Sequence, residues 1–343
     1  MKRIRLAVIT VRSAAGEIGG AERLFDGLVN ALNFDNVEAE EISLVSDESG
    51  FEPILSTYLR FHELDLSGFD GVISTKAPSY MVRHRNHVSY LLHTIRVFYD
   101  MFEREFPSPW SGLLDQRRFI HRIDTAALSP PGTRRIFVNG EEVRERLLQY
   151  NGLDAVVLHH PLNNERYHSG MGDEGYAFIA SRLHRWKRLD LTIRAMEYVR
   201  NPMRLLIAGT GEDEPWFRKL AGSDHRIVFL GRVSDEELIE LYGKARVVPF
   251  TPLREDYGLV TIEGFRCGKP VITCTDSGTP ARIVQDGITG FVTPPDPVAI
   301  ARALDYLYEH PAIAAEMGRK GEESIRHVRW DALRARILFE LGF

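Results

Sequence analysis

Two glutamates that could carry chemistry, Glu255 and Glu263, stand eight positions apart where an apolar run gives way to a helical pattern. Residues 245–250 have the length and composition of a short buried strand, and helical spacing starts at Gly258. This pattern predicts that Glu255 lies in the turn and that Glu263 lies about two turns into the helix. A solvated turn acid and an unrelated helix-surface acid would fit the same spacing, so the neighbouring residues must decide between the two interpretations.

The start of this predicted helix is a candidate anion-binding site. The backbone N–H groups of Gly258, Leu259 and Val260 have no partner within the helix, and the helix dipole adds about half a positive charge there. A phosphate could therefore bind at this end. Carboxylates beside a phosphate site suit a sugar nucleotide, because its hydroxyls need acceptors and its diphosphate needs donors.

A second candidate group is a run of basic residues that follows a predicted strand at residues 176–180. Arg182 could bind a diphosphate through forked hydrogen bonds, and Lys187 could add a compact charge, so that the leaving group is stabilised without a metal. The alternative is an ordinary basic loop neutralised by Asp190 and solvent. The basic run and the Glu255 turn both follow the ends of predicted strands. This shared position favours the diphosphate interpretation.

Glycines and a histidine complete the set of candidates. Gly19 and Gly20 lie between the first predicted strand and the first predicted helix, where they let the backbone approach a phosphate. Gly209 follows another strand, although any tight turn after a strand uses such a glycine. His93 ends the predicted strand 88–93 and could donate to a sugar hydroxyl. A structural histidine is the alternative at that position.

These candidates are positioned by two series of alternating strands and helices. The chain of 343 residues is too long for one comfortable core, and the alternation is typical of parallel sheets built from βαβ units. The predicted strands are residues 5–11, 39–45, 71–75, 88–93, 135–139, 155–159, 176–180, 204–208, 227–230, 246–250 and 270–274. The predicted helices are residues 21–32, 114–128, 141–150, 189–199, 215–220, 235–242 and 258–267, with an all-helical stretch after residue 297.

The expected fold is α/β, with two doubly wound Rossmann-like domains that face a central cleft and a helical C-terminal tail. We expect domains at residues 1–162 and 176–326, a polar linker at 163–175, and a helix at 327–343 that could pack back on the first domain. Ligands of such sheets bind at the carboxyl ends of the strands, to which the candidate residues map.

Composition narrows the function. A net charge of -5 argues against nucleic acid as the main partner, because binding to the phosphate backbone depends on a basic surface. The two cysteines, Cys267 and Cys274, are expected to be buried thiols of a reducing compartment, and the histidines show no zinc spacing. No apolar stretch approaches the ~18 residues of a spanning helix. We therefore expect a cytoplasmic protein whose contact with a membrane, if any, is peripheral at the inner surface.

Taken together, these residues resemble the retaining glycosyl group 1 transferases, family 4 of the GT-B glycosyltransferases. The resemblance covers nearly the whole chain and is strongest over residues 176–292. The segment 93–100 is also similar to a motif of mannosyltransferase-like members, with Ile95 in place of proline and Tyr99 in place of tryptophan. The matching features are Gly19-Gly20-Ala21-Glu22, the pair Arg182 and Lys187, the strand exit Gly231-Arg-Val233, the Glu255 to Glu263 motif and Asp286-Gly-Ile-Thr-Gly-Phe291.

The resemblance implies the GT-B fold and transfer of a hexose from a nucleoside-diphosphate sugar to a glycan or lipid-linked sugar, with retention of configuration. It implies no metal and no cofactor beyond the donor substrate. The implied contacts are Arg182, Lys187, the Gly20 backbone and the amides after Asp256 to the diphosphate, Glu263 to the ribose, Glu255 to the donor sugar, His93 to that sugar near its reacting carbon, and the backbone around Val233 to the base.

Within this family GDP-mannose is favoured as the donor over UDP-hexoses. Arg282 stands where the family commonly has glutamate, which puts the details of the donor site in doubt. One alternative is a sugar-nucleotide epimerase of the same architecture, but the set of Arg182, Lys187 and Glu255 favours transfer. The other is a non-catalytic glycan-binding or scaffolding subunit, and the presence of both Glu255 and Glu263 argues against it.

The acceptor side is less defined. Residues 76–135 contain many arginines and histidines, with the aromatic residues Tyr80, Tyr90 and Trp110 among them. Such a surface could meet a lipid-diphosphate sugar or an anionic glycan at a membrane, at about 1 kcal/mol per basic residue near anionic lipid. A solvated face fits the same composition equally well.

Overall fold

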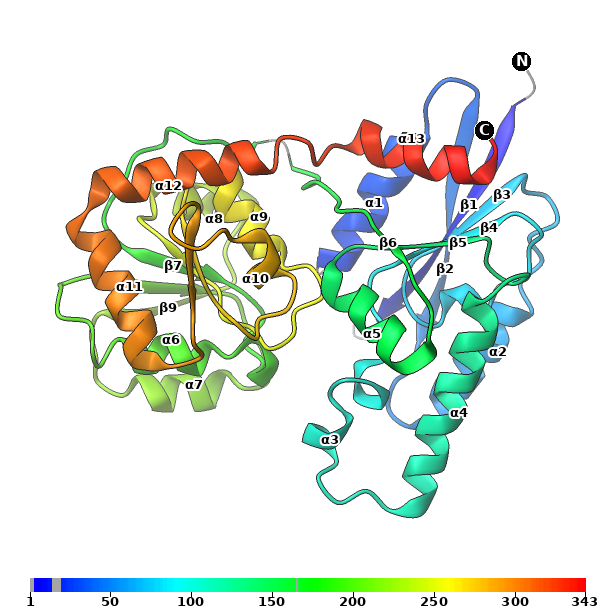
Figure 1. Ribbon diagram of the computed structural model, residues 1–343, viewed down its shortest axis with the longest axis horizontal. Helices are drawn as coiled ribbons and strands as arrows, with labels where there is room; N and C mark the ends of the chain where they lie inside the picture. The colour runs from blue at the N-terminus through cyan, green and yellow to red at the C-terminus, as the bar shows by residue number, and fades with distance from the viewer. Residues whose placement is uncertain (1–2, 14–19, 165) are drawn as a thin grey trace. The chain divides into compact units, whose positions relative to one another are not determined.

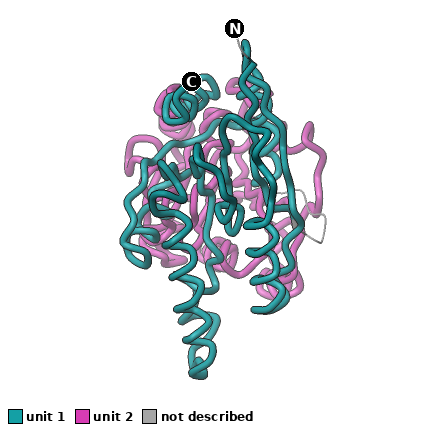
Figure 2. The backbone as a smooth tube through the Cα atoms, turned by 90° about the vertical axis from the view of Figure 1, so that its right-hand side faces the viewer, with its two compact units in different colours: residues 1–163, 328–343 teal, residues 164–327 magenta. Residues whose placement is uncertain are grey.

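The computed structural model describes residues 3–13, 20–164 and 166–343, and the chain forms two compact units (Figure 1 and Figure 2). The first unit contains Met1–Asn163 and Val328–Phe343, and the second contains Asn164–His327. Each unit has parallel strands joined by helices, so the α/β class predicted from the alternation of elements is confirmed.

The first unit has one parallel sheet with the strand order β2-β1-β3-β4-β5-β6. Its strands are β1 (Ile4–Ser13), β2 (Val37–Ser46), β3 (Gly71–Ser74), β4 (His87–Leu91), β5 (Arg135–Val138) and β6 (Val156–Val157). Its helices are α1 (Gly20–Leu32), α2 (Phe51–His62), α3 (Phe102–Glu105), α4 (Ser111–Leu128), α5 (Glu141–Asn151) and α13 (Trp330–Leu341).

Both faces of this sheet are covered, which explains why β1 is apolar without alternation from Leu6 to Ile9. Leu6 and Val8 pack in a core cluster with α1 and with Ile337 of α13. The alternate residues Ala7 and Ile9 pack in another cluster, with Phe61 of α2. The last helix of the chain therefore belongs to the core of the first unit (Figure 1).

The second unit has two three-stranded sheets, β7-β8-β9 and β10-β11-β12. Val247, just before β10, bridges Ala177 of β7, and its carbonyl accepts the N–H of Phe178 at 3.0 Å. The strands therefore continue as β9-β8-β7-β10-β11-β12, the doubly wound order that reverses between β7 and β10. They are β7 (Ala177–Ala180), β8 (Leu205–Ala208), β9 (Ile227–Gly231), β10 (Val248–Pro249), β11 (Val271–Cys274) and β12 (Gly290–Thr293).

Helices cover both faces of these strands. Ile179 of β7 packs in a core cluster with residues of α6 and α11, whereas the ring of its neighbour Phe178 contacts Tyr242 of α8. The helices are α6 (Leu189–Ala195), α7 (Glu214–Ala221), α8 (Asp235–Lys244), α9 (Leu259–Arg266), α10 (Pro280–Ile283), α11 (Pro297–Glu309) and α12 (Pro311–Ser324). Ligands of doubly wound sheets bind where the strand order reverses. In this unit that point lies between the loops after β7 and β10.

The structure adds elements that the sequence pattern did not predict. Helix α2 was missed; Pro53 lies in its first turn, where the absent N–H costs no helical hydrogen bond. Strand β12 was also missed; it stands between a glycine-containing turn and Pro294-Pro295. Both cysteines are buried free thiols, as predicted.

Other predicted elements are shorter in the structure. The predicted strand 88–93 ends at Leu91, and the predicted helix 189–199 ends at Ala195. The predicted strand 246–250 is reduced to Val248–Pro249, whose proline cannot donate to a sheet. These differences place His93 in a loop rather than on a strand.

A polar network lies inside the core of the first unit. The buried carboxylate of Asp124 on α4 accepts from the Tyr58 hydroxyl at 2.9 Å and from the Tyr99 hydroxyl at 2.7 Å. Burial raises the pKa of Asp124 from 3.8 to about 6, against the opposing effect of the tyrosine hydroxyls. The network joins α2 and α4 to the segment that follows β4.

We expect Asp124→Asn to change the pH dependence of the stability of the first unit. Because the folded-state pKa of about 6 lies above the ordinary 3.8, the folded unit binds more protons than the unfolded chain between these values. Its stability should therefore fall as the pH rises through this window, by up to about 3 kcal/mol. The variant should lack this slope. Hydrogen exchange of α4 peptides, compared between the two proteins at each pH, measures it.

Asp115→Asn on the exposed face of the same helix is the matched control and should retain the slope of the wild type. An unchanged slope in Asp124→Asn would mean that the buried carboxyl does not titrate in this window.

Candidate functional site

The loops after β7 and β10 bring Lys187 and Glu255 into contact. The Lys187 Nζ donates to both oxygens of the Glu255 carboxylate, at 2.7 and 2.8 Å. The two side chains are 28% and 16% exposed, so the pair is accessible without being fully solvated. The Phe250 ring centroid lies 5.9 Å from the same Nζ and adds a cation–π contact. A cation and a carboxylate thus meet at the point where the strand order of the second unit reverses.

The backbone of Glu255 is fixed by the loop after β11. Its N–H donates to the Ser277 carbonyl at 2.9 Å, and its carbonyl accepts from the Thr279 N–H at 3.0 Å. Gly278 between them has φ +75°, and a Cβ on it would lie 2.6 Å from the carbonyl oxygen of Glu255. The close approach therefore requires glycine. Gly278 was not among the predicted site residues, although its setting before Thr279-Pro280 signals a turn.

Arg188 holds three loops together. Its guanidinium forms two hydrogen bonds with the Asp276 carboxylate, at 2.6 and 2.7 Å, and donates to the carbonyls of Thr251 and Pro252 at 3.0 and 2.8 Å. These partners lie after β10 and β11, while Arg188 itself lies after β7. The sequence singled out Arg188 only as one of several basic residues; the structure shows that it positions the others.

The remaining basic residues of this loop have separate acidic partners. The Arg182 side chain is exposed and its Nε donates to Glu212 at 3.2 Å. Arg185 pairs with Asp213 at 3.3 Å. The acids that pair with this loop lie in the loops after β8, β10 and β11, and Asp190 adds an electrostatic interaction with Arg188.

Helix α9 begins directly after the Glu255 turn, as the pattern predicted. Gly258 is its N-cap with φ +83°, and Leu259 and Val260 are its first residues. Their N–H groups precede the first intrahelical bond, so this end can accept an anion. A Cβ on Gly258 would lie 2.6 Å from a side-chain carbon of Pro280, so the turn also needs glycine for space.

Glu263 lies further along α9 and is held by two tyrosines. Its carboxylate accepts from the Tyr242 hydroxyl at 2.6 Å and from the Tyr167 hydroxyl at 3.4 Å. Burial and the nearby Glu263 raise the pKa of Tyr242 well above its ordinary range, so the hydroxyl remains a donor. Neither tyrosine was predicted, since nothing in the local pattern links them to α9.

Two further predicted contacts lie at strand ends of the same unit. Gly209, after β8, has φ +120°, and a Cβ there would lie 2.0 Å from the Ser181 carbonyl oxygen. The approach of the two loops is thus a sufficient reason for glycine at that position. Val233 lies between β9 and Ser234, the N-cap of α8, whose side chain forms a capping box with Glu237.

In the first unit, Gly19 lies outside the described residues and Gly20 starts α1. His93 lies in the loop after β4, half-buried, with Nδ1 3.0 Å from the Thr94 carbonyl oxygen. Its own carbonyl accepts from the Ala77 N–H at 3.1 Å. The predicted position at the end of a strand is therefore corrected to a position in a hydrogen-bonded loop.

The residues that follow His93 are structural. Asp100 is paired with Arg96 at 2.6 Å and with the fully buried Arg146 of α5 at 2.8 Å. Tyr99 donates to Asp124 in the core network. These contacts fasten the segment 93–100 to α4 and α5, so its motif can be explained by packing.

The aromatic residues of the basic stretch 76–135 do not share one surface. Tyr80 and Tyr90 are buried in the core, whereas Trp110 is 63% exposed. The expectation of an aromatic and basic patch is therefore wrong for the two tyrosines. Over the described ranges, none of the helices combines the length and the apolar content of a transmembrane span.

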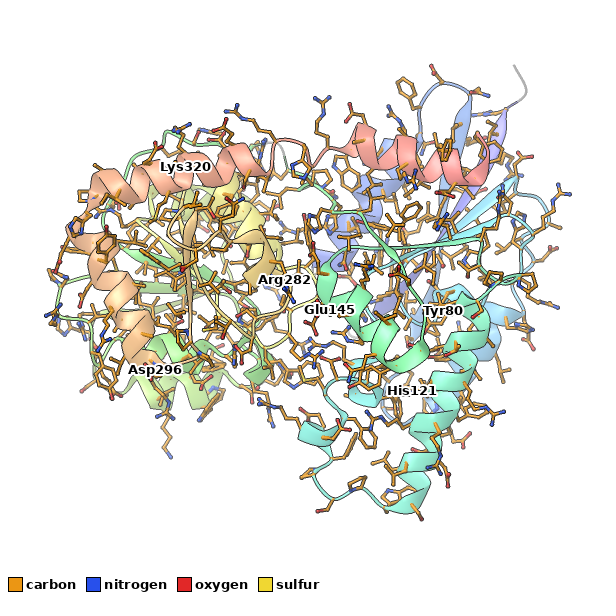
Figure 3. All side chains as sticks on the ribbon, viewed as in Figure 1. Tyr80, His121, Glu145, Arg282, Asp296 and Lys320 are labelled. Carbon is orange, nitrogen blue, oxygen red and sulfur yellow. The ribbon has the colours of Figure 1, made fainter. Side chains whose placement is uncertain are left out.

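Arg282, which stands where the resemblance led us to expect a glutamate, lies on the short helix α10 and is exposed (Figure 3). Its helix follows the Ser277 to Thr279 loop that holds Glu255. The exchange of a carboxylate for a guanidinium therefore changes the charge close to the candidate site without altering a buried contact.

We expect Gly278→Ala to destabilise the second unit more than Gly287→Ala does. Both glycines have left-handed φ values, +75° and +70°, so each alanine should cost about 1–2 kcal/mol of backbone strain. Only at Gly278 would the Cβ meet backbone atoms, within 2.6 and 2.7 Å at Glu255, which should add about 1–3 kcal/mol. Thermal denaturation measures the difference, and hydrogen exchange of the peptide that contains Glu255 locates it. If both variants lost the same stability and the hydrogen exchange of the Glu255 peptide were unchanged, the contact between Gly278 and Glu255 would not hold the glutamate in place.

Comparisons with known proteins agree with this geometry. Residues 164–324 match the family described as glycosyl transferases group 1. The chain is 29% identical over 222 residues to the D-rhamnosyltransferase WbpZ of Pseudomonas aeruginosa, which covers 62% of this chain and 57% of that protein. It is 26% identical over 216 residues to the human alpha-1,3/1,6-mannosyltransferase ALG2, covering 53% and 51%. The matches span about half the length of these relatives.

Solved structures show the fold. A sucrose-phosphate synthase from Thermosynechococcus elongatus superposes with a TM-score of 0.75 at 18% identity, covering 98% of each chain. HepE from Anabaena, in complex with UDP and glucose, superposes with a TM-score of 0.73 at 15% identity, covering 99% of this chain and 100% of that one. The chain therefore has the GT-B fold of two Rossmann-like domains, and residues 164–324, nearly all of its second unit, match the glycosyl transferases group 1 family.

Proposed function

We propose that this protein is a retaining glycosyltransferase that moves a hexose from a nucleoside-diphosphate sugar to a glycan or lipid-linked sugar acceptor and requires no metal. The observation that carries the proposal is the Lys187 and Glu255 pair at the reversal of the strand order, beside the start of α9. A donor presents both of the groups that this pair can bind: phosphates for the lysine and hydroxyls for the carboxylate.

The diphosphate would be held by cations and by the helix end. In the structure Lys187 is engaged with Glu255, and Arg182 with Glu212. Both ion pairs are partly exposed. Such a pair contributes little net free energy and can exchange for a phosphate with more acceptor oxygens. The N–H groups of Leu259 and Val260 would add backbone donors. Together these groups would stabilise the departing diphosphate, the role that a metal fills in other transferases.

The sugar and the nucleoside would be bound by the carboxylates. Release of Lys187 leaves Glu255 as an acceptor for hydroxyls of the donor sugar. Glu263, oriented by Tyr242, would accept from the ribose. The backbone around Val233 would border the base. The backbone at Gly19, Gly20 and Gly209 would add contacts to the donor. For His93 the proposed role is the contact to the donor sugar that the resemblance implies.

Retention of configuration would follow from attack on the same face as the leaving group, with a donor phosphate oxygen taking the proton of the acceptor. The protein then has to stabilise an oxocarbenium-like sugar and a departing diphosphate, which is a task of electrostatic preorganisation. Removing Arg182 would raise the barrier by about 3–4 kcal/mol, as loss of a charge-stabilising donor does elsewhere.

The donor base and the acceptor are the finer parts of the proposal. The relatives include proteins named as a rhamnosyltransferase and a mannosyltransferase, whereas the superposed HepE structure contains UDP and glucose. We favour GDP-mannose, with UDP-hexoses as the alternative. A cytoplasmic enzyme that touches the inner membrane surface through basic residues of the first unit would reach a lipid-linked acceptor.

The proposal predicts stabilisation of the protein by one class of sugar nucleotide in the presence of EDTA. A ligand at 100 times its Kd adds about 2.7 kcal/mol, which is a clear shift in the thermal unfolding temperature. GDP and GDP-mannose should give this shift and UDP compounds should not. Lys187→Met should lose most of the shift with GDP itself, because the diphosphate loses its lysine. Glu255→Gln should keep the shift with GDP and lose the additional shift with GDP-mannose.

Glu240→Gln on the exposed face of α8 is the matched control for Glu255→Gln and should behave as the wild type. A shift only with uridine compounds would retain the transferase and reject mannose. A shift that needs added metal would contradict the metal-independent mechanism. No shift with any nucleotide would favour the non-catalytic alternative.

A further inference from the structure

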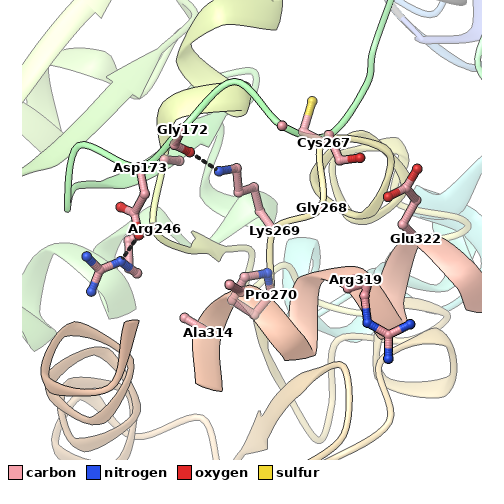
Figure 4. Close-up of a pocket in the computed structure, with 14 residues that line it drawn as sticks. Gly172, Asp173, Arg246, Cys267, Gly268, Lys269, Pro270, Ala314, Arg319 and Glu322 are labelled. Carbon is pink, nitrogen blue, oxygen red and sulfur yellow. Dashed lines mark hydrogen bonds and ion pairs between the residues drawn. The ribbon is translucent and has the colours of Figure 1, made fainter. Parts of the chain in front are cut away.

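A cavity lies in the second unit (Figure 4). It is at the opposite ends of the strands from the Lys187 and Glu255 pair. Its lining includes Arg246, which precedes β10, and Lys269 and Pro270, which precede β11. The segment around Gly172 and helix α12 form its other walls. Its volume of ≈ 410 Å³ is that of a site for a small molecule.

Lys269 is the unusual group in this cavity. Its side chain is buried, at 7% exposed, and its Nζ donates one hydrogen bond, to the Gly172 carbonyl oxygen at 2.7 Å. An ammonium has three donors, so two remain for a ligand or water. Among the residues that the structure describes, no carboxylate lies within ion-pair distance of this Nζ. Burial lowers the pKa of Lys269, against the opposing effect of the nearby Asp173 carboxylate.

The other cations of the lining are already compensated. Arg246 forms an ion pair with Asp173 and donates to the carbonyls of Leu307 and Tyr308 at 3.1 and 2.8 Å. Arg319 pairs with two glutamates of its own helix. Three basic and two acidic side chains line the cavity, and of the three cations only Lys269 has no carboxylate within ion-pair distance among the described residues.

We propose that this cavity binds a small molecule through one phosphate or carboxylate group, which pairs with the Lys269 ammonium. The anion supplies the acceptors that the buried Nζ lacks, and the remaining volume accommodates the rest of the molecule. The site is separate from the proposed donor site, because the two lie at opposite ends of the same strands. The inference does not depend on the transferase reaction.

The test is thermal unfolding of the full chain during titration with sodium phosphate and, separately, sodium acetate, at constant pH and ionic strength. We expect a shift of about 5 °C near saturation in the wild type. Lys269→Met, which retains the length of the side chain without its charge, should lose the shift. Lys219→Met on the exposed face of α7 removes the same charge and should keep it. General salt effects are common to all three proteins.

Each outcome decides the proposal. A shift with phosphate alone identifies a phosphorylated ligand, and a shift with acetate alone identifies a carboxylate ligand. A shift that persists in Lys269→Met but disappears in Lys187→Met would place the anion in the donor loop and overturn the second site. The absence of any shift difference between wild type and Lys269→Met would overturn it as well.

A second measurement applies even if Lys269→Met does not fold. Reductive methylation of lysines in the wild-type protein, followed by peptide mass spectrometry, reports the access of reagent to each Nζ. Bound phosphate or acetate should slow the modification of Lys269 at least severalfold and leave Lys219 unchanged. Equal rates at Lys269 with and without both anions would contradict the proposal.

Discussion

The ion pair between Arg188 and Asp276 is the contact on which the candidate site depends. Parallel strands deliver their following loops to one edge of the sheet, where backbone hydrogen bonds join some of them. The Arg188 guanidinium adds side-chain hydrogen bonds to these, to Asp276 after β11 and to two carbonyls after β10. Lys187 directly precedes Arg188, and Glu255 directly follows Arg254, whose N–H donates to the Asp276 carbonyl at 3.0 Å. Both candidate residues are therefore placed by neighbours of this one pair.

The two ion pairs of the site differ in a way that suits their roles. Arg188 has a planar fork with several simultaneous partners, so removal of any one of them leaves the loops joined. Lys187 is a flexible point charge with a single carboxylate partner that is open to solvent. The Arg188 and Asp276 pair therefore fixes the loops, and the Lys187 and Glu255 pair between them can exchange. A ligand can displace the exchangeable pair without disturbing the loops, because the backbone of Glu255 is held separately by Ser277 and Thr279.

Sequence patterns predicted the features that depend on neighbouring residues, and the remainder required the structure. The strand before Glu255 and the helix that starts at Leu259 follow from local periodicity. The partners of that turn do not, because Gly278 and Arg188 meet it only through the order of the strands. The same applies to the tyrosines that hold Glu263. His93 was misplaced because an apolar run continues beyond the last residue that pairs in β4, and apolar character alone does not mark the end of a ladder.

Helix α9 runs between the two ends of the sheet, with Lys187 near its start and Lys269 beyond its end. The two lysines differ in how their charges are compensated. At its start, the charge of Lys187 is paired and partly solvated, so its net cost is small. Beyond its end, Lys269 is buried with one carbonyl for a partner. Burial of an incompletely compensated cation is destabilising, and a methionine would fill a similar volume at no such cost. The ammonium has one hydrogen-bond acceptor and the more distant charge of Asp173, and a bound anion would complete this partial compensation.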